Sequence, residues 1–159
     1  MANEVFKTPV SVLALIHTPA LEVLLIERAL HRGFWQSVTG SLEADESPRE
    51  TAAREVAEET GIVIAASNLH DWHLSNRFEI FQQWRHRYAP GVTHNVEHVF
   101  SLELPAPCEV HLAPREHVDA AWLPWREAAA RCFSWSNRDA ILMLPSRVNS
   151  PMSSPPRPK

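Results

Sequence analysis

Cysteine is scarce in this chain. Only two of its 159 residues are cysteines, Cys108 and Cys132. Two are too few for a disulfide framework or for a zinc site built from cysteines, so we expect free thiols in a cytoplasmic protein. Histidine is more frequent, with nine residues, but no H-E-x-x-H or paired-cysteine spacing marks a zinc site.

Long apolar runs and strong positive charge are also missing. The run Val10–Ile16 is too short to cross a membrane, and it lacks the basic start and the small-residue cleavage site of a signal peptide. The formal net charge is -4, whereas nucleic-acid binding usually needs a basic surface. We therefore expect neither a membrane partner nor a nucleic-acid partner.

Length and composition fit a single globular domain. The chain is 45% hydrophobic and 21% charged, which is ordinary for a protein with one hydrophobic core. We expect this domain to span residues 1–145. Residues 146–159 are rich in proline and serine, and this composition predicts a disordered tail.

Short β-rich runs alternate with helical segments along the chain. The expected strands lie at residues 10–16, 23–27, 34–39, 62–65, 71–89, 96–104 and 117–122. Two expected helices lie at residues 124–131 and 137–144. Together with one further helix, this order predicts a mixed α/β sandwich.

The further helix has clear signals at both ends. Ser47 can act as its N-cap, Pro48 occupies the first helical position and Glu50 completes a capping box. Gly61 is expected to end it, since glycine tolerates the left-handed conformation at a helix C-terminus.

Three glutamates share this helix. Glu55 and Glu59 are four residues apart, so they project from the same face about one turn apart, and Glu58 lies beside them. Carboxylates packed together repel one another unless a cation lies among them, and Mg²⁺ prefers such oxygen ligands. The alternative is a solvated acidic face on which Arg54 and Glu58 form an ordinary surface ion pair.

The spacing of the whole segment is more specific than an acidic helix face. Residues 40–62 read GSLEADESPRETAAREVAEETGI and follow the pattern G-x5-E-x7-R-E-V-x-E-E-x-G-I. In this pattern the chain resembles the Nudix hydrolases at every defined position. The resemblance implies an α/β/α sandwich in which a mixed sheet holds a loop–helix–loop motif. It also implies a pyrophosphatase that acts on a small-molecule triphosphate with Mg²⁺, which Mn²⁺ can replace.

The resemblance assigns roles to the motif residues. It implies a metal site formed by a backbone carbonyl and three carboxylates, from Gly40, Glu55, Glu58 and Glu59. Glu58 and Glu59 would also position or deprotonate water. Arg54 would orient the glutamates, through Glu46 or Glu58.

Four further segments lie outside the motif: VFKTPVSVL at 5–13, FWQSVTGS at 34–41, FEIFQQWRHRYAPGVTHNVEHVF at 78–100 and SWSNRDAI at 134–141. They resemble the Nudix enzymes that release pyrophosphate from dihydroneopterin triphosphate in bacterial folate biosynthesis. The resemblance implies one more metal ligand, Glu116. It implies a substrate-binding set formed by Lys7, Arg28, Thr39, Phe78, Glu79, Ile80, Phe81 and Ser134.

Other interpretations stay open at this point. The substrate could be an ordinary or oxidised nucleoside triphosphate, since guanine and pterin share an amino-oxo pyrimidine edge. The fold could also serve as a catalytically inactive binding module, although such a module should lose the motif carboxylates. Lys7, Arg28 and Glu116 could be solvated charges, and Phe78, Ile80 and Phe81 could be core residues. Residues 85–87 could form an exposed strand or a triphosphate clamp.

Overall fold

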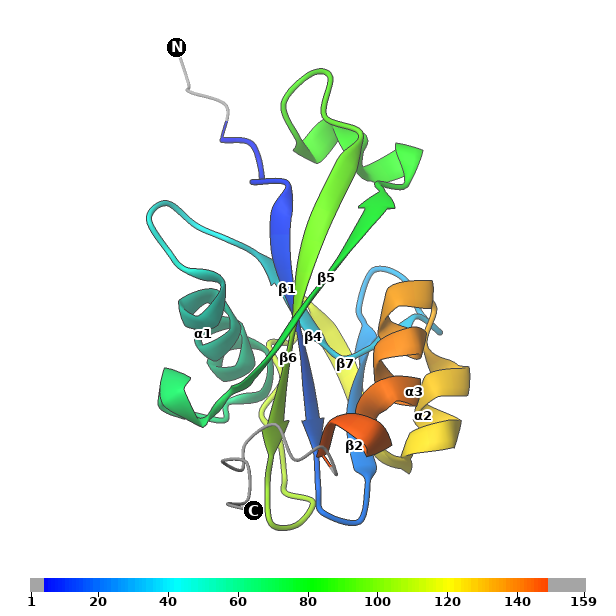
Figure 1. Ribbon diagram of the computed structural model, residues 1–159. Coiled ribbons are helices and arrows are strands. Elements are labelled where there is room, and N and C mark those ends of the chain that lie inside the picture. Colours follow the sequence, from blue (N-terminus) through cyan, green and yellow to red (C-terminus); the bar gives the residue numbers. More distant parts are fainter. Residues whose placement is uncertain (1–4, 149–159) are drawn as a thin grey trace, which may run out of the picture.

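A mixed β-sheet forms the middle layer of the computed structural model, which describes residues 5–148 (Figure 1). The strands are β1 (Val10–His17), β2 (Glu22–Arg28), β3 (Trp35–Gln36), β4 (Val38–Ser41), β5 (His70–Glu79), β6 (His94–Glu103) and β7 (His117–Pro124). The main order is β3-β2-β1-β6-β5, while β4 pairs with β1 and β7 pairs with β2. Strands β1 and β6 run parallel, and the other pairs are antiparallel.

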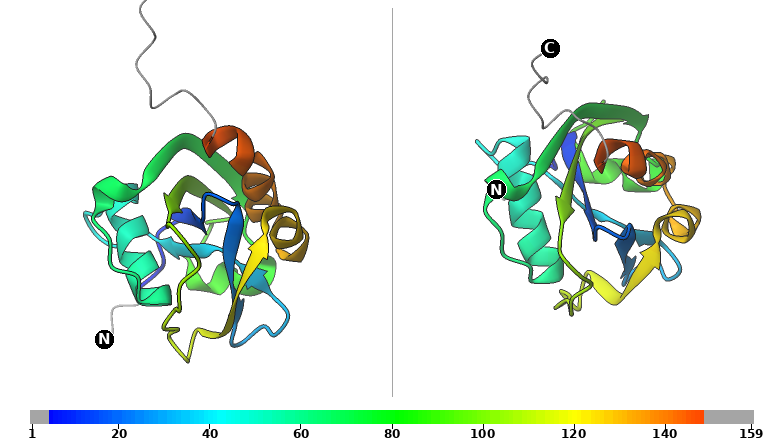
Figure 2. Two further views of the ribbon diagram at one scale, coloured as in Figure 1. Left: turned by 90° about the horizontal axis from the view of Figure 1, so that it is seen from below. Right: turned by 60° about the horizontal axis from the view of Figure 1, so that its bottom comes forward.

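Helices cover both faces of the sheet. Helix α1 (Pro48–Thr60) lies on one face, and α2 (Trp125–Arg131) and α3 (Trp135–Val148) lie on the other, as two further views also show (Figure 2). Two short 3₁₀ helices, η1 (Ala66–Asn68) and η2 (Gln82–Arg87), complete the structure. The expected α/β/α sandwich with a mixed sheet is confirmed.

The alternation of side chains along β1 explains the two layers. Val12, Ala14 and Ile16 pack in the core beneath α1, whereas Leu13 and Leu15 pack in the core beneath α2 and α3. Because successive strand residues point to opposite faces, a strand that is apolar from Val12 to Ile16 can serve both cores.

One expected strand is wrong, and another is confirmed only in part. Residues 62–65 alternate as a strand would, with Ile62 and Ile64 packed on the core and Val63 exposed, but they pair with no strand of the sheet. The expected run at 71–89 holds one strand, β5, and then turns into η2 because the backbone bonds locally, with Trp84 N donating to Phe81 O at 2.9 Å.

The expected start of the tail is also wrong. Helix α3 continues through Pro145 to Val148. Tertiary contacts hold its end: Leu144 is fully buried, and Arg147 donates from Nη1 to the carbonyl of Trp72 at 3.0 Å. The remaining tail residues, 149–159, lie outside the described part of the chain. Among residues 5–148, no helix combines the length and the apolar character that crossing a bilayer requires.

Candidate active site

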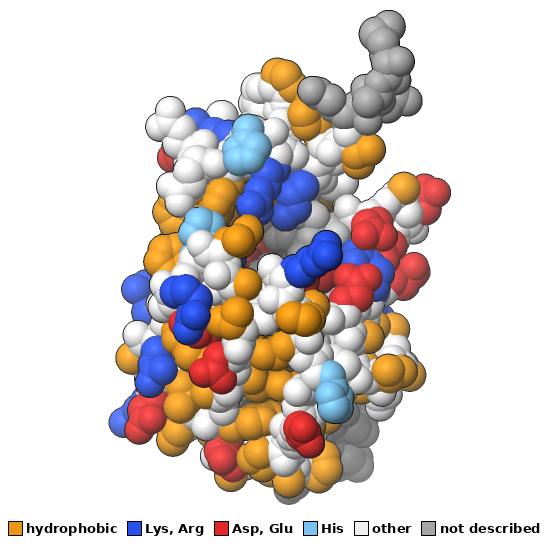
Figure 3. Space-filling view, turned by 180° about the vertical axis from the view of Figure 1, so that it is seen from behind, with side chains coloured by type: hydrophobic (Ala, Val, Ile, Leu, Met, Phe, Trp, Pro, Cys, Tyr) orange, Lys and Arg blue, Asp and Glu red, His pale blue; other side chains and the backbone are white. Residues whose placement is uncertain are grey.

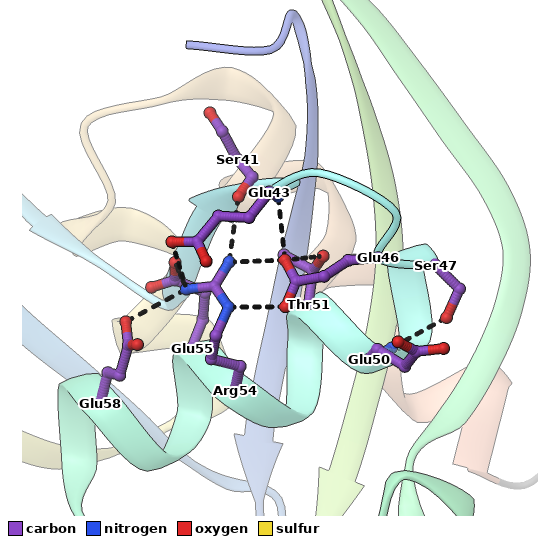
Figure 4. A network of polar contacts seen from close by, with 9 residues as sticks. All are labelled: Ser41, Glu43, Glu46, Ser47, Glu50, Thr51, Arg54, Glu55 and Glu58. Carbon is purple, nitrogen blue, oxygen red and sulfur yellow. Dashed lines mark hydrogen bonds and ion pairs between the residues drawn. The ribbon is translucent and has the colours of Figure 1, made fainter. Parts of the chain in front are cut away.

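The ends of α1 fix the orientation of its acidic face. Ser47 Oγ accepts a hydrogen bond from Glu50 N at 3.2 Å, as Figure 4 shows. Gly61 adopts a left-handed conformation with φ 77° and donates from its backbone N–H to Ala57 O at 2.9 Å. Local capping thus defines where the helix begins and ends, as the sequence predicts.

Arg54 lies at the centre of a polar network on α1 (Figure 4). Its guanidinium donates two hydrogen bonds to Glu46, from Nε at 2.7 Å and from Nη2 at 2.9 Å. Glu46 also accepts from Thr51 Oγ1 at 3.0 Å and from Glu43 N at 2.9 Å. The hydrogen bonds from Arg54, foremost, lower the pKa of Glu46 to about 2, so its negative charge persists over the working range of most enzymes.

The same guanidinium reaches the other motif carboxylates. Nη1 donates to Glu55 Oε1 at 2.7 Å and to Glu58 Oε2 at 3.2 Å. Both options considered for Arg54, a contact with Glu46 and a contact with Glu58, therefore occur together. Glu58 keeps 55% of its side chain exposed, whereas Glu55 keeps 14%.

Gly40 lies directly against Glu55. A Cβ atom at position 40 would overlap the carboxyl carbon, Oε1 and Cγ of Glu55, well inside van der Waals contact. Only glycine leaves room for this approach. The backbone of β4 and the carboxylate on α1 thus come together, which a metal site shared by Gly40 and Glu55 would need.

Glu59 is the most buried carboxylate of the motif. It is 2% exposed, and its Oε2 atom has no hydrogen-bond partner among the described residues. Burial, then repulsion from Glu55 and a smaller contribution from Glu116, raise the pKa of Glu59 well above its ordinary value, while the Thr39 backbone N–H opposes this shift. A buried, unpartnered oxygen among like charges fits a bound cation, which would remove both the repulsion and the missing contact.

His117 lies next to Glu59, and the sequence did not predict it as a site residue. Its Nε2 lies 3.5 Å from Glu59 Oε1, and the ring is 5% exposed. Burial, together with repulsion from Arg28, lowers the pKa of His117 to about 4. The ring is therefore neutral near pH 7 and does not balance the charge of Glu59. Its position directly after Glu116 was the only available sequence signal.

The carboxylates do not form a closed cage. In the part of the chain that the structure describes, no three His, Cys, Asp or Glu side chains gather as ligands around one point. Arg54 draws Glu55 and Glu58 toward itself. Such an open arrangement suits Mg²⁺, which binds through a few carboxylates and completes its shell with water and substrate phosphates.

Lys7 and Arg28 lie close enough to this acidic group to interact with it, and Arg87 acts on both of them. Burial and the positive charge of Arg87 lower the pKa of Lys7, while Glu55 and Glu59 act in the opposite direction. Burial and Arg87 likewise lower the pKa of Arg28, which Glu59 opposes. In Figure 3, Lys and Arg side chains border a hollow in the surface on two sides, next to a group of acidic side chains. The hollow combines the charges that a metal and a phosphate chain require.

Residues 85–87 divide between two roles. Arg87 lies near Lys7 and Arg28, and its carbonyl accepts a hydrogen bond from Lys7 N at 2.8 Å. Arg85 instead bonds Ile80 O at 3.1 Å and forms an ion pair with Glu79. The structure therefore does not place both arginines together as a triphosphate clamp, because only Arg87 lies near Lys7.

The other expected substrate residues lie in different surroundings. Ile80 is 4% exposed and Phe81 is 51% exposed, while Phe78 is half-buried and meets Trp135 edge to face at 6.5 Å. Thr39 donates its hydroxyl to Val12 O at 2.9 Å. Ser134 directly precedes α3, and its Oγ accepts a hydrogen bond from Asn137 N in the first turn of that helix at 3.2 Å.

An aromatic cluster lies beside Arg28, and sequence reasoning missed it. The rings of Phe34 and Phe133 stack at 4.7 Å, and Trp84 meets Phe133 edge to face at 6.4 Å. The guanidinium of Arg28 lies over Trp84, 4.7 Å from its ring centroid. This cation–π contact holds Arg28 toward the acidic group. The cluster joins segments about a hundred residues apart, so no local pattern reveals it.

Comparison with known proteins identifies the family. The NUDIX domain matches residues 7–144. The chain belongs to the Nudix family. Nudix hydrolases generally use divalent metal ions, in agreement with the fit of Glu59 and its neighbours to a cation.

Several Nudix relatives resemble the chain along nearly its whole length. Dihydroneopterin triphosphate diphosphatase of Escherichia coli K12 is 45% identical over 89% of this chain and 95% of that protein. The protein of the same name from Haemophilus influenzae is 39% identical over 86% of this chain and 87% of that protein.

Solved structures agree. The E. coli dihydroneopterin triphosphate pyrophosphohydrolase superimposes with a TM-score of 0.80 at 45% identity, covering 86% of this chain and 94% of that one. A Nudix hydrolase from Listeria monocytogenes, 21% identical with a TM-score of 0.73 over 89% of this chain and 94% of that one, shares the fold.

Proposed function

We propose that the protein hydrolyses dihydroneopterin triphosphate to dihydroneopterin monophosphate and pyrophosphate, with Mg²⁺ as cofactor. The observation that carries the proposal is the buried carboxylate of Glu59, which lies among other carboxylates and close to Lys7 and Arg28. The choice of substrate rests on the named E. coli relative, 45% identical to this chain. Such an enzyme would act in folate biosynthesis, and we expect it in the cytoplasm.

The divalent cation would be held by Gly40, Glu55, Glu58, Glu59 and Glu116. When bound, it would neutralise phosphate charge and lower the pKa of a water molecule. Mn²⁺ accepts similar oxygen ligands and is expected to replace Mg²⁺. Arg54 is a positioning residue in this scheme, since it holds Glu46, Glu55 and Glu58 in place.

The basic side chains would bind the triphosphate. Burial contributes most to the lowered pKa values of Lys7 and Arg28, and repulsion from Arg87 adds to both shifts. A phosphate chain among them would replace this repulsion by attraction. Arginine can also offer two parallel N–H groups to one phosphate. Binding would thus place the phosphate chain beside Glu59.

The reaction breaks one phosphoanhydride bond. Water attacks the α-phosphorus, the bond from this phosphorus to the oxygen bridging the β-phosphorus breaks, and pyrophosphate leaves with the bonding electrons. The proton of the attacking water passes to a carboxylate, for which Glu58 and Glu59 are the candidates. Burial and repulsion from Glu55 raise the pKa of Glu59, so its carboxylate holds a proton more strongly than an ordinary glutamate does.

Hydrolysis in ¹⁸O-labelled water tests the proposal. With Mg²⁺ present we expect one labelled oxygen in dihydroneopterin monophosphate and none in pyrophosphate, and no turnover in excess EDTA. Label confined to pyrophosphate would mean attack at the β-phosphorus. Faster hydrolysis of dATP or 8-oxo-dGTP than of the pterin compound would favour a nucleotide pyrophosphatase, and no turnover of any of them would favour a binding module.

A further inference from the structure

Strand β6 carries polar side chains on a buried face. Asn95, Glu97, Val99 and Ser101 alternate along the strand, and each is at most 5% exposed. Val99 packs in the core beneath α2 and α3, so this face points away from α1. Buried polar groups on such a face need hydrogen-bond partners or another explanation.

Ser101 has a partner, but Asn95 and Glu97 have atoms that lack one. Ser101 Oγ accepts from the indole N–H of Trp72 at 2.9 Å. Asn95 donates from Nδ2 to Ser11 Oγ at 2.7 Å, but its Oδ1 has no partner among the described residues. Glu97 bonds the hydroxyl of Ser136, and its Oε1 likewise has no partner there. Two adjacent acceptors on one face are therefore free to accept N–H groups.

The surroundings of Glu97 contain hydroxyl groups and no opposing charge that acts on it. Burial raises the pKa of Glu97 to about 7, and the Ser136 hydroxyl only partly opposes this shift. No arginine, lysine or second carboxylate contributes to the shift. A cation site would normally gather several carboxylates, so this environment fits a neutral ligand that donates hydrogen bonds.

The sheet register relates these acceptors to β4, the strand that carries Gly40. In the sheet register, Glu97 pairs with Ser11, and Ser11 pairs with Ser41 of β4, the residue after Gly40. The Ser41 hydroxyl bonds Tyr88, and its carbonyl accepts from Arg54 Nη2 at 3.2 Å. One strand therefore links the Arg54 network to the polar face of β6.

Aromatic rings border the same place. Phe78 of β5 pairs with Asn95 in the sheet register and meets Trp135 edge to face. Trp135 is 46% exposed and directly precedes Ser136, the partner of Glu97. Flat heterocycles bind well against such rings while their polar edges pair with buried acceptors.

We infer that Glu97 and Asn95 recognise the 2-amino-4-oxo-pyrimidine edge of the substrate, which pterin and guanine share. This inference rests on the proposed function for the phosphate end of the substrate. The 2-amino group and the adjacent ring N–H donate to the Glu97 carboxylate, and Asn95 accepts a further N–H. Adenine has no ring N–H beside an amino group in this arrangement, and hypoxanthine lacks the 2-amino group.

The variant Glu97→Gln tests the inference through substrate ratios. Replacing one acceptor oxygen by an NH₂ group sets a donor against a donor. We expect kcat/KM for dihydroneopterin triphosphate and dGTP to fall by about 10- to 100-fold, that for dITP to fall less, and that for dATP to stay within about twofold. The matched control is Glu103→Gln, the same change at an exposed position of β6, which should leave all four values unchanged.

A binding measurement separates recognition from chemistry. Neopterin carries the edge without phosphates, so quenching of its fluorescence reports binding without turnover. Wild type and Glu103→Gln should bind it alike, and Glu97→Gln about tenfold more weakly. Equal loss of kcat/KM for all four substrates in Glu97→Gln, unchanged neopterin binding, or no neopterin binding by wild type would overturn the inference. Failure to hydrolyse dihydroneopterin triphosphate, with the nucleotide ratios as expected, would instead remove only the proposed substrate.

Discussion

The two faces of the sheet each bury a glutamate, and the two environments differ in charge. Glu59, on the α1 side, lies near Glu55 and Glu116, with Lys7 and Arg28 acting on the same region. Glu97, on the α3 side, meets a serine hydroxyl and no second charge. Both carboxylates have a raised pKa and an oxygen without a partner in the described chain.

This difference shows what each site can bind. A buried carboxylate crowded by others gains most from a cation, because one ion relieves every repulsion at once. A buried carboxylate alone among hydroxyl groups gains most from neutral N–H donors, which satisfy its oxygens without burying another charge. The raised pKa alone does not distinguish the two, whereas the neighbouring charges do.

The largest expected effect comes from Glu59→Gln on the crowded side. We expect turnover to fall by about 10²- to 10⁴-fold, because a metal ligand and candidate base is lost. The fold should persist, since glutamine has the same shape and removes a buried charge. Pyrophosphate release and circular dichroism measure the two effects. The control Glu50→Gln changes an exposed position of the same helix. Wild-type turnover in Glu59→Gln would remove Glu59 from the catalytic machinery.

The next effect concerns stability on the α3 side. The folded pKa of Glu97, about 7, exceeds its unfolded value, so the protonated form favours folding and its ionisation costs stability as pH rises from about 4.5 to 7. Glutamine does not titrate. Relative to wild type, Glu97→Gln should therefore gain about 2.5 kcal/mol in the free energy of unfolding between about pH 5 and pH 8.

Urea unfolding at the two pH values measures this gain. Glu103→Gln, at an exposed position of the same strand, should give the same difference from wild type at both pH values. A pH-independent difference for Glu97→Gln would show that the Glu97 carboxyl titrates normally in the folded protein, and the contrast between the two faces would then reduce to metal binding alone.

A smaller effect on activity is expected when lysine replaces Arg54, the positive partner of the motif carboxylates. Arg54→Lys keeps the positive charge but cannot donate to both Glu46 oxygens and to Glu55 at once. We expect kcat/KM to fall about tenfold. Since the pKa of Glu46 is lowered to about 2, the stability it contributes is present above about pH 4.5 and lost toward pH 2. Acid unfolding of Arg54→Lys should therefore begin at higher pH.

Arg138→Lys, at an exposed site on α3, serves as its control and should match wild type in both measurements. Equal kcat/KM for Arg54→Lys and wild type would mean that charge alone, without the geometry of the guanidinium, arranges the motif carboxylates.

The smallest expected effect belongs to Glu116, which is exposed and acts on Glu59 from another loop. Glu116→Ala should raise the Mg²⁺ concentration for half-maximal rate several-fold, because one ligand of a partly solvated site is lost. Mg²⁺ titrations of wild type, Glu116→Ala and the exposed control Glu103→Ala measure this shift. Superimposable curves for Glu116→Ala and wild type would exclude Glu116 from the metal site.

Local signals predicted the fold where local interactions determine it. Ser47 and Gly61 cap the two ends of α1, and the sequence predicts them because capping involves neighbours in the chain. Alternating aromatic residues after Glu79 indicated a strand, but backbone bonds within residues 81–88 form η2. Proline and serine composition indicated a tail from residue 146, whereas contacts with Trp72 extend α3. Tertiary contacts decided both cases.

The candidate site divides in the same way. The motif carboxylates and Arg54 lie within one short segment, so their spacing could be read directly. Arg87 meets Lys7 only through folding, and nothing in the sequence separated it from Arg85. Glu97 belongs to a run that alternates as any half-buried strand does, and the sequence does not show that its partner is Ser136, on a distant helix.

Strand β4 has one further consequence, for divergence within the fold. Gly40 lies against the carboxylate of Glu55 on α1, while the hydroxyl of the next residue, Ser41, bonds Tyr88. Under the two proposals, one substrate reaches both sets of residues, with bond cleavage assigned to the carboxylates of α1 and recognition of the heterocycle to β6. Mutations in β6 or the start of α3 can then alter which molecule is accepted without disturbing how it is cut. A lineage could exchange substrates through a few such changes while its cleavage motif stayed intact.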